Sequence, residues 1–377
     1  MKTKSPFEFG FTVTGKEFTN RTVEKENLQA NFENKISTIL ISPRRWGKSS
    51  LIEEVAINTV KKNKTIKIAI LDLFAAKSEE EFYNLYASEI IKATSSKLEE
   101  WLVSTKDFFR NIIPSISLGS DPINDFEINF TVKDISTNSQ EILNLPERIA
   151  KKKNIQIVVC IDEFQNLSNF DDSVDFQRKL RSVWQKHKNV CYCLYGSKRH
   201  MMIDFFQNQS MPFYRFGQTM FLEKISLEHW KKFIIKSFKN TDKVISAKLA
   251  SSIAENVKLH SYYVQQLSHL VWIRTNNEVN EEIVDQATND IVSQNAIFYQ
   301  KVYEELSYTQ VNFLKALANG EKKFSSKRVL VDYKLGVPSN VSKIKEALEL
   351  KEVIDTFQPD IEFLDPVFEL WFNKNIL

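Results

Sequence analysis

The chain has 377 residues, more than one ordinary domain, so its length predicts two or three folded units. Hydrophobic residues make up 42% of it and charged residues 26%, which is typical of a globular protein and argues against intrinsic disorder. Its 51 basic and 48 acidic side chains give a net charge of +3. This near-balance gives no electrostatic sign of bulk nucleic-acid binding, although it allows a local basic patch.

Membrane insertion and secretion are not expected. No apolar run approaches the roughly 20 residues that span a bilayer, and no apolar stretch follows the N-terminal lysines. The three cysteines, Cys160, Cys191 and Cys193, lie in apolar runs typical of buried strands. An odd number of cysteines at such positions favours reduced thiols and a cytoplasmic protein.

Strand and helix patterns alternate through the first 225 residues. The first four strand runs are almost continuously hydrophobic, as in parallel strands buried on both faces, and the alternation predicts an α/β fold with helices flanking a parallel sheet. A break in the pattern predicts a β-hairpin on the sheet edge, with strands at 115–118 and 126–132. The expected strands are 38–42, 66–74, 155–164, 190–197 and 219–225, and the expected helices are 48–61, 79–103, 140–153 and 175–187.

The pattern becomes helical after residue 225. Apolar spacings of three and four predict an all-α lid with helices at 230–238, 245–257, 262–272 and 283–292. Further on, helices at 310–317 and 339–351 precede alternating runs at 353–357 and 361–364, which predicts a C-terminal winged-helix domain. The predicted domains are therefore a core at 1–225, a lid at 226–296 and a winged helix at 297–377.

A Gly-Lys-Ser segment stands where the first expected strand meets a helix. Residues 42–50 read SPRRWGKSS, which fits the G-x-x-x-x-G-K-S/T phosphate loop except at its first position. Backbone N–H groups at a helix N-terminus attract phosphate oxygens, and Gly47 lets the backbone approach them. We expect Lys48 to bridge the β- and γ-phosphates of ATP and Ser49 to ligate Mg²⁺. Ser42 replaces the first glycine, and a positive φ there would cost about 1 kcal/mol.

Two carboxylates end the third expected strand. Asp162 and Glu163 follow an apolar run and should face the same sheet edge as Lys48, because ligands bind at the carboxyl ends of parallel strands. We expect Asp162 to hold Mg²⁺ through its waters and Glu163 to orient or deprotonate the attacking water. Each motif has an alternative interpretation. Lys48 could begin a helix that binds no ligand, and the two acids could simply be favourable near a helix N-terminus. The presence of both motifs in one chain weighs against both alternatives.

With these motifs, the chain resembles the archaeal-type ATPase family, a signal-transduction branch related to the AAA+ ATPases. The resemblance runs from about residue 18 to residue 372. It implies a P-loop NTPase core, a helical lid and a winged helix, with hydrolysis of ATP to ADP and phosphate. The matching segments are FTNRTVEKE at 18–26, PRRWGKS at 43–49, DEFQ at 162–165, YGS at 195–197, PFYR at 212–215 and FLDPVFELW at 363–371.

The resemblance also implies roles for single residues. Phe18 and Arg21 belong to a segment that lies near the adenine, and Ser197 stands where the γ-phosphate is sensed. Arg215 is either a transition-state arginine, a nucleotide sensor or a surface residue, and the sequence leaves these open. Ser261 stands where the family's lid has proline. The remaining loop residues expected at the nucleotide are Pro43, Arg44, Arg45, Trp46, Gly47 and Ser50.

The sequence does not decide whether the winged helix binds DNA or protein. The helix at 339–351 mixes Lys343, Lys345 and Lys351 with acidic residues, whereas a DNA-reading helix has a clearer positive face. We therefore favour a regulatory or protein-facing domain over DNA binding, with the apolar ending 363–372 buried against the lid or core.

Three functions compete on this basis. The favoured one is an ATP-driven molecular switch in a signalling or defence complex, which would have a protein partner or a second copy of the chain. The second is a DNA-associated ATPase that uses the winged helix. The third is a nucleotide-binding scaffold with little turnover. No membrane partner is expected.

Overall fold

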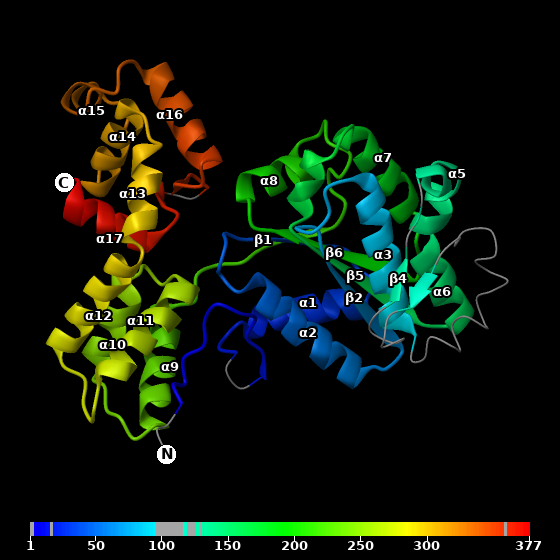
Figure 1. Ribbon diagram of the computed structural model, residues 1–377, viewed down its shortest axis with the longest axis horizontal. Coiled ribbons are helices and arrows are strands. Elements are labelled where there is room, and N and C mark those ends of the chain that lie inside the picture. The colour runs from blue at the N-terminus through cyan, green and yellow to red at the C-terminus, as the bar shows by residue number, and fades with distance from the viewer. Residues whose placement is uncertain are drawn as a thin grey trace. The chain divides into compact units, whose positions relative to one another are not determined.

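The computed structural model describes residues 4–15, 18–95, 116–118, 126–128, 130, 132–357 and 360–377 (Figure 1). Their contacts define two units. The core unit comprises Arg21–Arg44 and Lys48–Glu223. The helical unit comprises the described residues before Arg21, together with Arg45–Gly47 and Lys224–Leu377. In these ranges, no helix has the length and apolar character needed to cross a bilayer.

A parallel sheet of five strands forms the centre of the core unit, in the order β2-β5-β6-β1-β7. All five strands expected from the apolar runs are confirmed, with ends that differ by a few residues. The register aligns Asp72 with Asp162 and Ile41 with Gly196, so these strands end at one edge. The strands are β1 (Thr38–Ile41), β2 (Ile66–Asp72), β5 (Gln156–Asp162), β6 (Val190–Gly196) and β7 (Gln218–Phe221).

Helices cover both faces of this sheet (Figure 1). On one face lie α1 (Thr22–Glu33) and α2 (Lys48–Lys62). On the other lie α3 (Glu79–Thr94), α7 (Ser173–Trp184) and α8 (Arg199–Gln207). The second face contains an aromatic stack, since the Trp184 ring lies 4.2 Å from Tyr192 and 6.0 Å from Tyr86. Both faces of the sheet are therefore buried, which explains the continuous apolar runs.

The structure corrects several details of the sequence prediction. The single helix expected at 140–153 is two helices, α5 (Val132–Leu143) and α6 (Leu145–Lys153), because Pro146 has no N–H to donate to the carbonyl four residues before it and is tolerated only in the first turn of a helix. Strands β3 (Ile116–Leu118) and β4 (Phe126–Ile128) pair with each other in a separate sheet instead of extending the main one. The helix expected at 79–103 is confirmed to Thr94, and 96–103 lie outside the described residues. Helices α1 and α8 were not predicted.

The helical unit contains the four predicted lid helices. Side-chain caps begin several helices of this unit, as where Ser246 accepts the N–H of Leu249 and Asn280 that of Ile283. The N-terminal segment also belongs to this unit, whereas the domain boundaries predicted from the sequence had placed it in the core. The ring centroids of Phe7 and Phe238, for example, lie 5.5 Å apart. The lid helices are α9 (Leu227–Lys239), α10 (Ala247–Asn256), α11 (Ser261–Arg274) and α12 (Glu281–Gln294).

The winged helix completes the helical unit. The sequence predicted α14, α16 and the two wing strands but missed α13, α15 and the C-terminal α17. One hydrophobic cluster runs through lid and winged helix, from Trp230 to Phe372. The two parts of this unit therefore share a core. The elements are α13 (Ala296–Glu304), α14 (Tyr308–Ala318), α15 (Lys327–Asp332), α16 (Pro338–Leu350), β8 (Ile354–Asp355), β9 (Glu362–Phe363) and α17 (Pro366–Asn375).

Candidate nucleotide site

The phosphate loop joins β1 to α2, the strand–loop–helix context that its sequence predicts. Its left-handed residues are Arg45, with φ 62°, and Gly47, with φ 91°. Ser42 is not among the described residues with positive φ, and its buried hydroxyl donates to the Pro43 carbonyl at 3.1 Å. The strain anticipated at Ser42 is therefore absent, and the left-handed cost of about 1 kcal/mol falls on Arg45 instead.

Lys48 opens α2 and is only 6% exposed. Burial lowers the pKa of its ammonium, and the nearby charges of Asp162 and Glu163 oppose that shift. The two carboxylates favour the charged form of Lys48, whereas its burial favours the neutral form. Lys48 therefore lies beside two acidic groups at the first turn of a helix, the kind of position at which phosphates bind in other proteins.

Ser49 and Asp162 meet where α2 begins and β5 ends. The Ser49 hydroxyl donates to Asp162 Oδ2 at 2.8 Å, and the Glu163 N–H donates to Oδ1 at 2.8 Å. Burial raises the pKa of Asp162 to about 6, although the Lys48 charge and the Ser49 hydrogen bond act against it. A hydroxyl and a carboxylate at this separation are hard oxygen donors of the kind that Mg²⁺ prefers.

The oxygen donors fit a magnesium ion that is bound mainly through phosphates and water. No cluster of three or more His, Cys, Asp or Glu suited to a metal occurs in the described part of the chain. Mg²⁺ usually takes one or two protein oxygens and keeps several waters, so Ser49 and Asp162 suffice.

Glu163 has a strained backbone and a restrained side chain. Its φ is 49°, a left-handed conformation that non-glycine residues adopt at a cost. Its Oε2 accepts hydrogen bonds from the Ser197 hydroxyl at 2.9 Å and from Nε2 of Gln165. Ser197 in turn accepts a hydrogen bond from Nε of Arg44 at 3.3 Å. The structure thus joins Arg44 of the phosphate loop to Glu163 through Ser197, three residues that the sequence assigned separately.

Arg21 and Arg215 have different surroundings from these residues. Arg21 is buried and donates to the Glu223 carbonyl at 2.5 Å and to Glu24 at 2.9 Å, so its described contacts tie the start of α1 to the residues after β7. Arg215 is exposed and left-handed, with its guanidinium 5.1 Å from the Tyr214 ring. In the described ranges, Arg215 forms no hydrogen bond or ion pair with Lys48 or the acidic pair.

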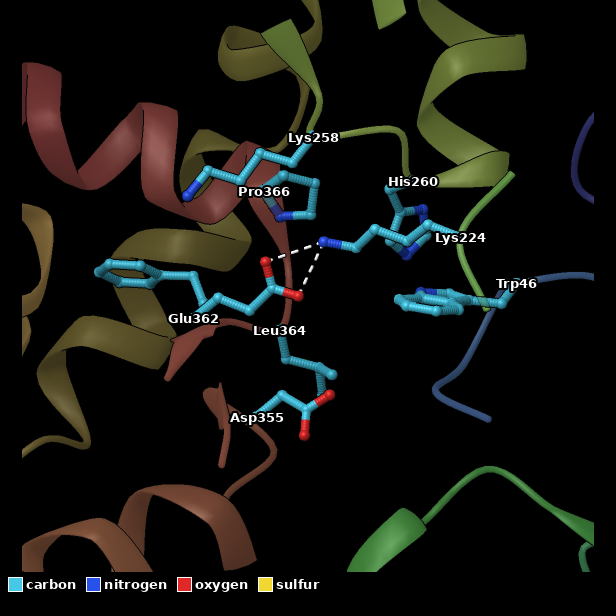
Figure 2. A pocket seen from close by; sticks show the side chains of 9 residues that line it. Trp46, Lys224, Lys258, His260, Asp355, Glu362, Leu364 and Pro366 are labelled. Carbon is cyan, nitrogen blue, oxygen red and sulfur yellow. Dashed lines mark hydrogen bonds and ion pairs between the residues drawn. The ribbon is translucent and has the colours of Figure 1, made fainter. Parts of the chain in front are cut away.

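The middle of the phosphate loop belongs to the helical unit. The Arg45 guanidinium lies 4.7 Å from the Tyr262 ring, and the Trp46 ring lies 6.5 Å from His260. The Lys224 ammonium lies 5.7 Å from the Trp46 ring and pairs with both oxygens of Glu362, at 2.7 and 2.8 Å. Figure 2 shows Trp46, His260, Lys224 and Glu362 around a small cavity, with the Glu362 carboxylate facing the Lys224 ammonium and the Trp46 ring on the other side of Lys224.

Two other predicted features also lie in the helical unit. Ser261, which replaces the usual lid proline, is the first residue of α11, where a proline is favourable but not required because its N–H needs no helical partner. Phe18 is partly buried, and its N–H donates to the Gly15 carbonyl at 3.3 Å.

Sequence reasoning gave no role to Gln165, Gly196 or Lys224. Gln165 follows the acidic pair, and Gly196 precedes Ser197, so both lie beside predicted residues. Their closeness in the sequence to Glu163 and Ser197 could have marked Gln165 and Gly196 as candidate site residues. Their contacts depend on how β5, η2 (Phe164–Asn169) and β6 come together, which no local pattern gives.

The fold is one that solved protein structures share. The chain has the archaeal Walker-type, AAA+-like ATPase fold with a C-terminal winged-helix domain. Residues 297–374 match a family described as a probable winged helix domain.

Two solved structures illustrate the similarity. The Walker-type ATPase of Pyrococcus abyssi has a TM-score of 0.67 and 16% identity, over 98% of this chain and 99% of that one. The ORC2 protein of Aeropyrum pernix, solved in ADPNP–ADP complexes, has a TM-score of 0.56 and 13% identity, over 98% of this chain and 96% of that one. No curated protein matches the sequence. At such identities the likeness shows the fold, and function must be argued from the site.

Proposed function

We propose that this chain binds ATP with Mg²⁺, hydrolyses it to ADP and phosphate, and acts as a nucleotide-driven switch. The observation that carries the proposal is the group formed by Lys48, Ser49, Asp162 and Glu163. It combines a buried cation, a hydroxyl 2.8 Å from a carboxylate, and a second carboxylate bound by Ser197. These are the parts that phosphoryl transfer to water needs.

Each residue has a distinct part in the proposed reaction. Lys48 and the loop N–H groups bind the phosphates, and Ser49 and Asp162 would hold Mg²⁺, which would neutralise charge on the phosphate oxygens. Glu163 accepts a proton from the attacking water as the water oxygen bonds to the γ-phosphorus. The bond from that phosphorus to the β–γ bridging oxygen breaks, and ADP leaves.

Contacts within the helical unit support the switch part of the proposal. Arg45 and Trp46 of the phosphate loop touch Tyr262 and His260 at the start of α11. Lys224 lies over Trp46 and pairs with Glu362 of the wing. A change in the loop on nucleotide binding would therefore alter contacts to both lid and wing, which is how a switch transmits its state.

A DNA-associated role is less well supported. Basic side chains of the winged helix are paired with acids of the same domain: Lys322 lies 2.7 Å from Asp360, and Arg328 lies 2.5 Å from Glu321. Such pairing lowers the positive potential that a phosphate backbone would need.

The proposed function is tested by measuring ATP affinity and turnover in the wild type and two variants. Glu163→Gln should keep ATP affinity within about threefold and lower kcat at least a hundredfold, since it keeps the shape and removes the base. Asp162→Asn should raise the Mg²⁺ concentration needed for half-maximal activity. Wild-type turnover in both variants would refute the mechanism, and absence of turnover in the wild type would leave the scaffold function in its place.

A further inference from the structure

Gln165 is a buried side chain that forms a hydrogen bond to Glu163, the proposed base. It lies in η2, two residues after Glu163, and is 1% exposed. Its Nε2 donates to Glu163 Oε2, the same oxygen that accepts the Ser197 hydroxyl. Because a carboxylate only accepts hydrogen bonds, the amide nitrogen must face Glu163 and the amide oxygen must face away. Two donors therefore restrain one oxygen of Glu163.

Gly196 provides the space that Gln165 occupies. A Cβ on Gly196 would overlap the Gln165 amide oxygen and lie 2.8 Å from Sδ of Met202. Gly196 is not among the described residues with positive φ, so its backbone does not require glycine. The close approach of the Gln165 amide, and to a lesser degree of Met202 Sδ, is what excludes a larger residue there.

The amide oxygen of Gln165 is buried and has no hydrogen-bond partner in the described part of the chain. A buried unsatisfied oxygen is unfavourable, so an apolar residue would suit this position better if packing alone mattered. The favourable half of the interaction is the hydrogen bond to Glu163.

We propose that Gln165 is a positioning residue for Glu163, and that Gly196 is small in order to admit it. Gln165 and Ser197 hold Oε2, so that Oε1 is the oxygen that takes the proton from the attacking water. This inference rests on the proposed ATP hydrolysis and adds a residue pair that sets the orientation of its base.

The test compares kcat and ATP affinity for Gln165→Ala, Gly196→Ala and the double variant. Gln165→Ala should lower kcat at least tenfold and keep ATP affinity within about twofold, because the base is misoriented while the phosphate contacts remain. Gly196→Ala should lower kcat similarly by displacing the amide. The double variant should match Gln165→Ala, since the added methyl then has no amide to displace and meets only the flexible end of Met202, which can move aside.

Two further variants keep the test decisive. Gln177→Ala truncates another fully buried glutamine of the core unit, in α7 and without side-chain hydrogen bonds in the described ranges, and should leave kcat within twofold. Gln165→Met keeps the side-chain length without the donor, and it replaces Gln165→Ala if the alanine variant fails to bind ATP. Circular dichroism checks that each variant is folded.

The outcomes separate this inference from the proposed function. If the wild type hydrolyses ATP and Glu163→Gln does not, but Gln165→Ala and Gln165→Met keep normal kcat, Gln165 has no positioning role. Multiplicative losses in the double variant would also overturn the inference, because Gly196 would then act independently of Gln165. If the wild type is inactive, or Glu163→Gln remains active, the proposed function itself fails.

Discussion

Asp365 Oδ2 accepts a hydrogen bond from the Tyr263 hydroxyl at 2.6 Å, which binds the C-terminal helix to the lid. The Tyr299 hydroxyl reaches the same oxygen at 3.1 Å. Oδ1 caps α17 by accepting the N–H groups of Val367 and Phe368, at 2.9 and 3.1 Å. Burial, followed by the Asp365 charge, raises the pKa of both tyrosines. One carboxylate thus joins α11, α13 and α17 within the helical unit.

Tyr263→Phe should therefore destabilise the helical unit by about 1–2 kcal/mol, because it removes one hydrogen bond to a charged group. Urea unfolding monitored by circular dichroism measures the change. Tyr303→Phe is the matched control, since Tyr303 contacts Trp371 and Phe372 through its ring and its hydroxyl has no described hydrogen bond. The control should change stability by less than about 0.5 kcal/mol. Equal effects of the two variants would contradict the role given to Asp365.

Lys48→Ala should weaken ATP binding by about 2–5 kcal/mol, or roughly thirtyfold or more, because the phosphates lose a buried cation. Isothermal titration calorimetry measures the affinity. The same change removes the positive charge that lowers the Asp162 pKa, which is about 6 in the wild type, so the apo variant should also be less stable than the wild type above about pH 6. Unchanged ATP affinity in a folded variant would rule out the phosphate-loop assignment.

The winged helix should bind DNA weakly and without sequence preference. Its helix α16 exposes Lys343 and Glu346 together, and Lys351 donates to the Glu305 carbonyl at 2.6 Å. Fluorescence anisotropy with duplex DNA at two salt concentrations should give dissociation constants above about 1 μM near physiological salt. Lys343→Ala should change that value by less than about threefold. Tight, salt-sensitive binding that is lost in Lys343→Ala would instead favour the DNA-associated function.

His187 makes the stability of the core unit depend on pH. Its Nδ1 lies 2.8 Å from the Tyr192 hydroxyl and its Nε2 lies 3.2 Å from Oδ1 of Asn144. Burial lowers the pKa of His187 to about 4, against the opposing charge of Glu147. The unfolded chain takes up a proton near pH 6.5 and the folded chain only near pH 4, so stability is complete above about pH 6.5 and falls as pH drops toward 4.

In the wild type, we expect the titration of His187 to lower the free energy of unfolding by about 2 kcal/mol between pH 7 and pH 4.5. His187→Gln should reduce this decrease, because glutamine does not titrate. Urea unfolding at both pH values, for wild type and variant, gives the comparison. The raised pKa of Asp162 acts in the opposite direction over part of this range, but it is common to both proteins and cancels in the difference. Identical pH dependence in the two proteins would show that His187 does not titrate as proposed.

Much of the fold could be predicted because its signals are local. Continuous apolar runs gave the five parallel strands, and helical spacing gave the lid. The sequence patterns did not predict α1, whose apolar residues form no clear stripe, or α8, which is only 9 residues long. They also placed the hairpin on the main sheet, although its two strands pair with each other in a separate sheet. The apolar ending was expected to be buried against lid or core, and Phe363, Val367, Phe368, Trp371 and Phe372 are indeed buried in a cluster shared with the lid.

Local motifs were enough to identify the chemical groups of the candidate site, because Lys48, Ser49, Asp162 and Glu163 lie in short segments at one strand end or one helix start. The hydrogen-bond partners of these groups could be seen only in the folded chain. The hydrogen bonds of Glu163 to Ser197 and Gln165 join β5, η2 and β6, and the bond of Ser197 to Arg44 reaches the phosphate loop. Spacing along the chain says nothing about such contacts, because they depend on the order of strands in the sheet. Burial of Lys48 follows from the same packing, since a helix start is exposed or enclosed according to what folds over it.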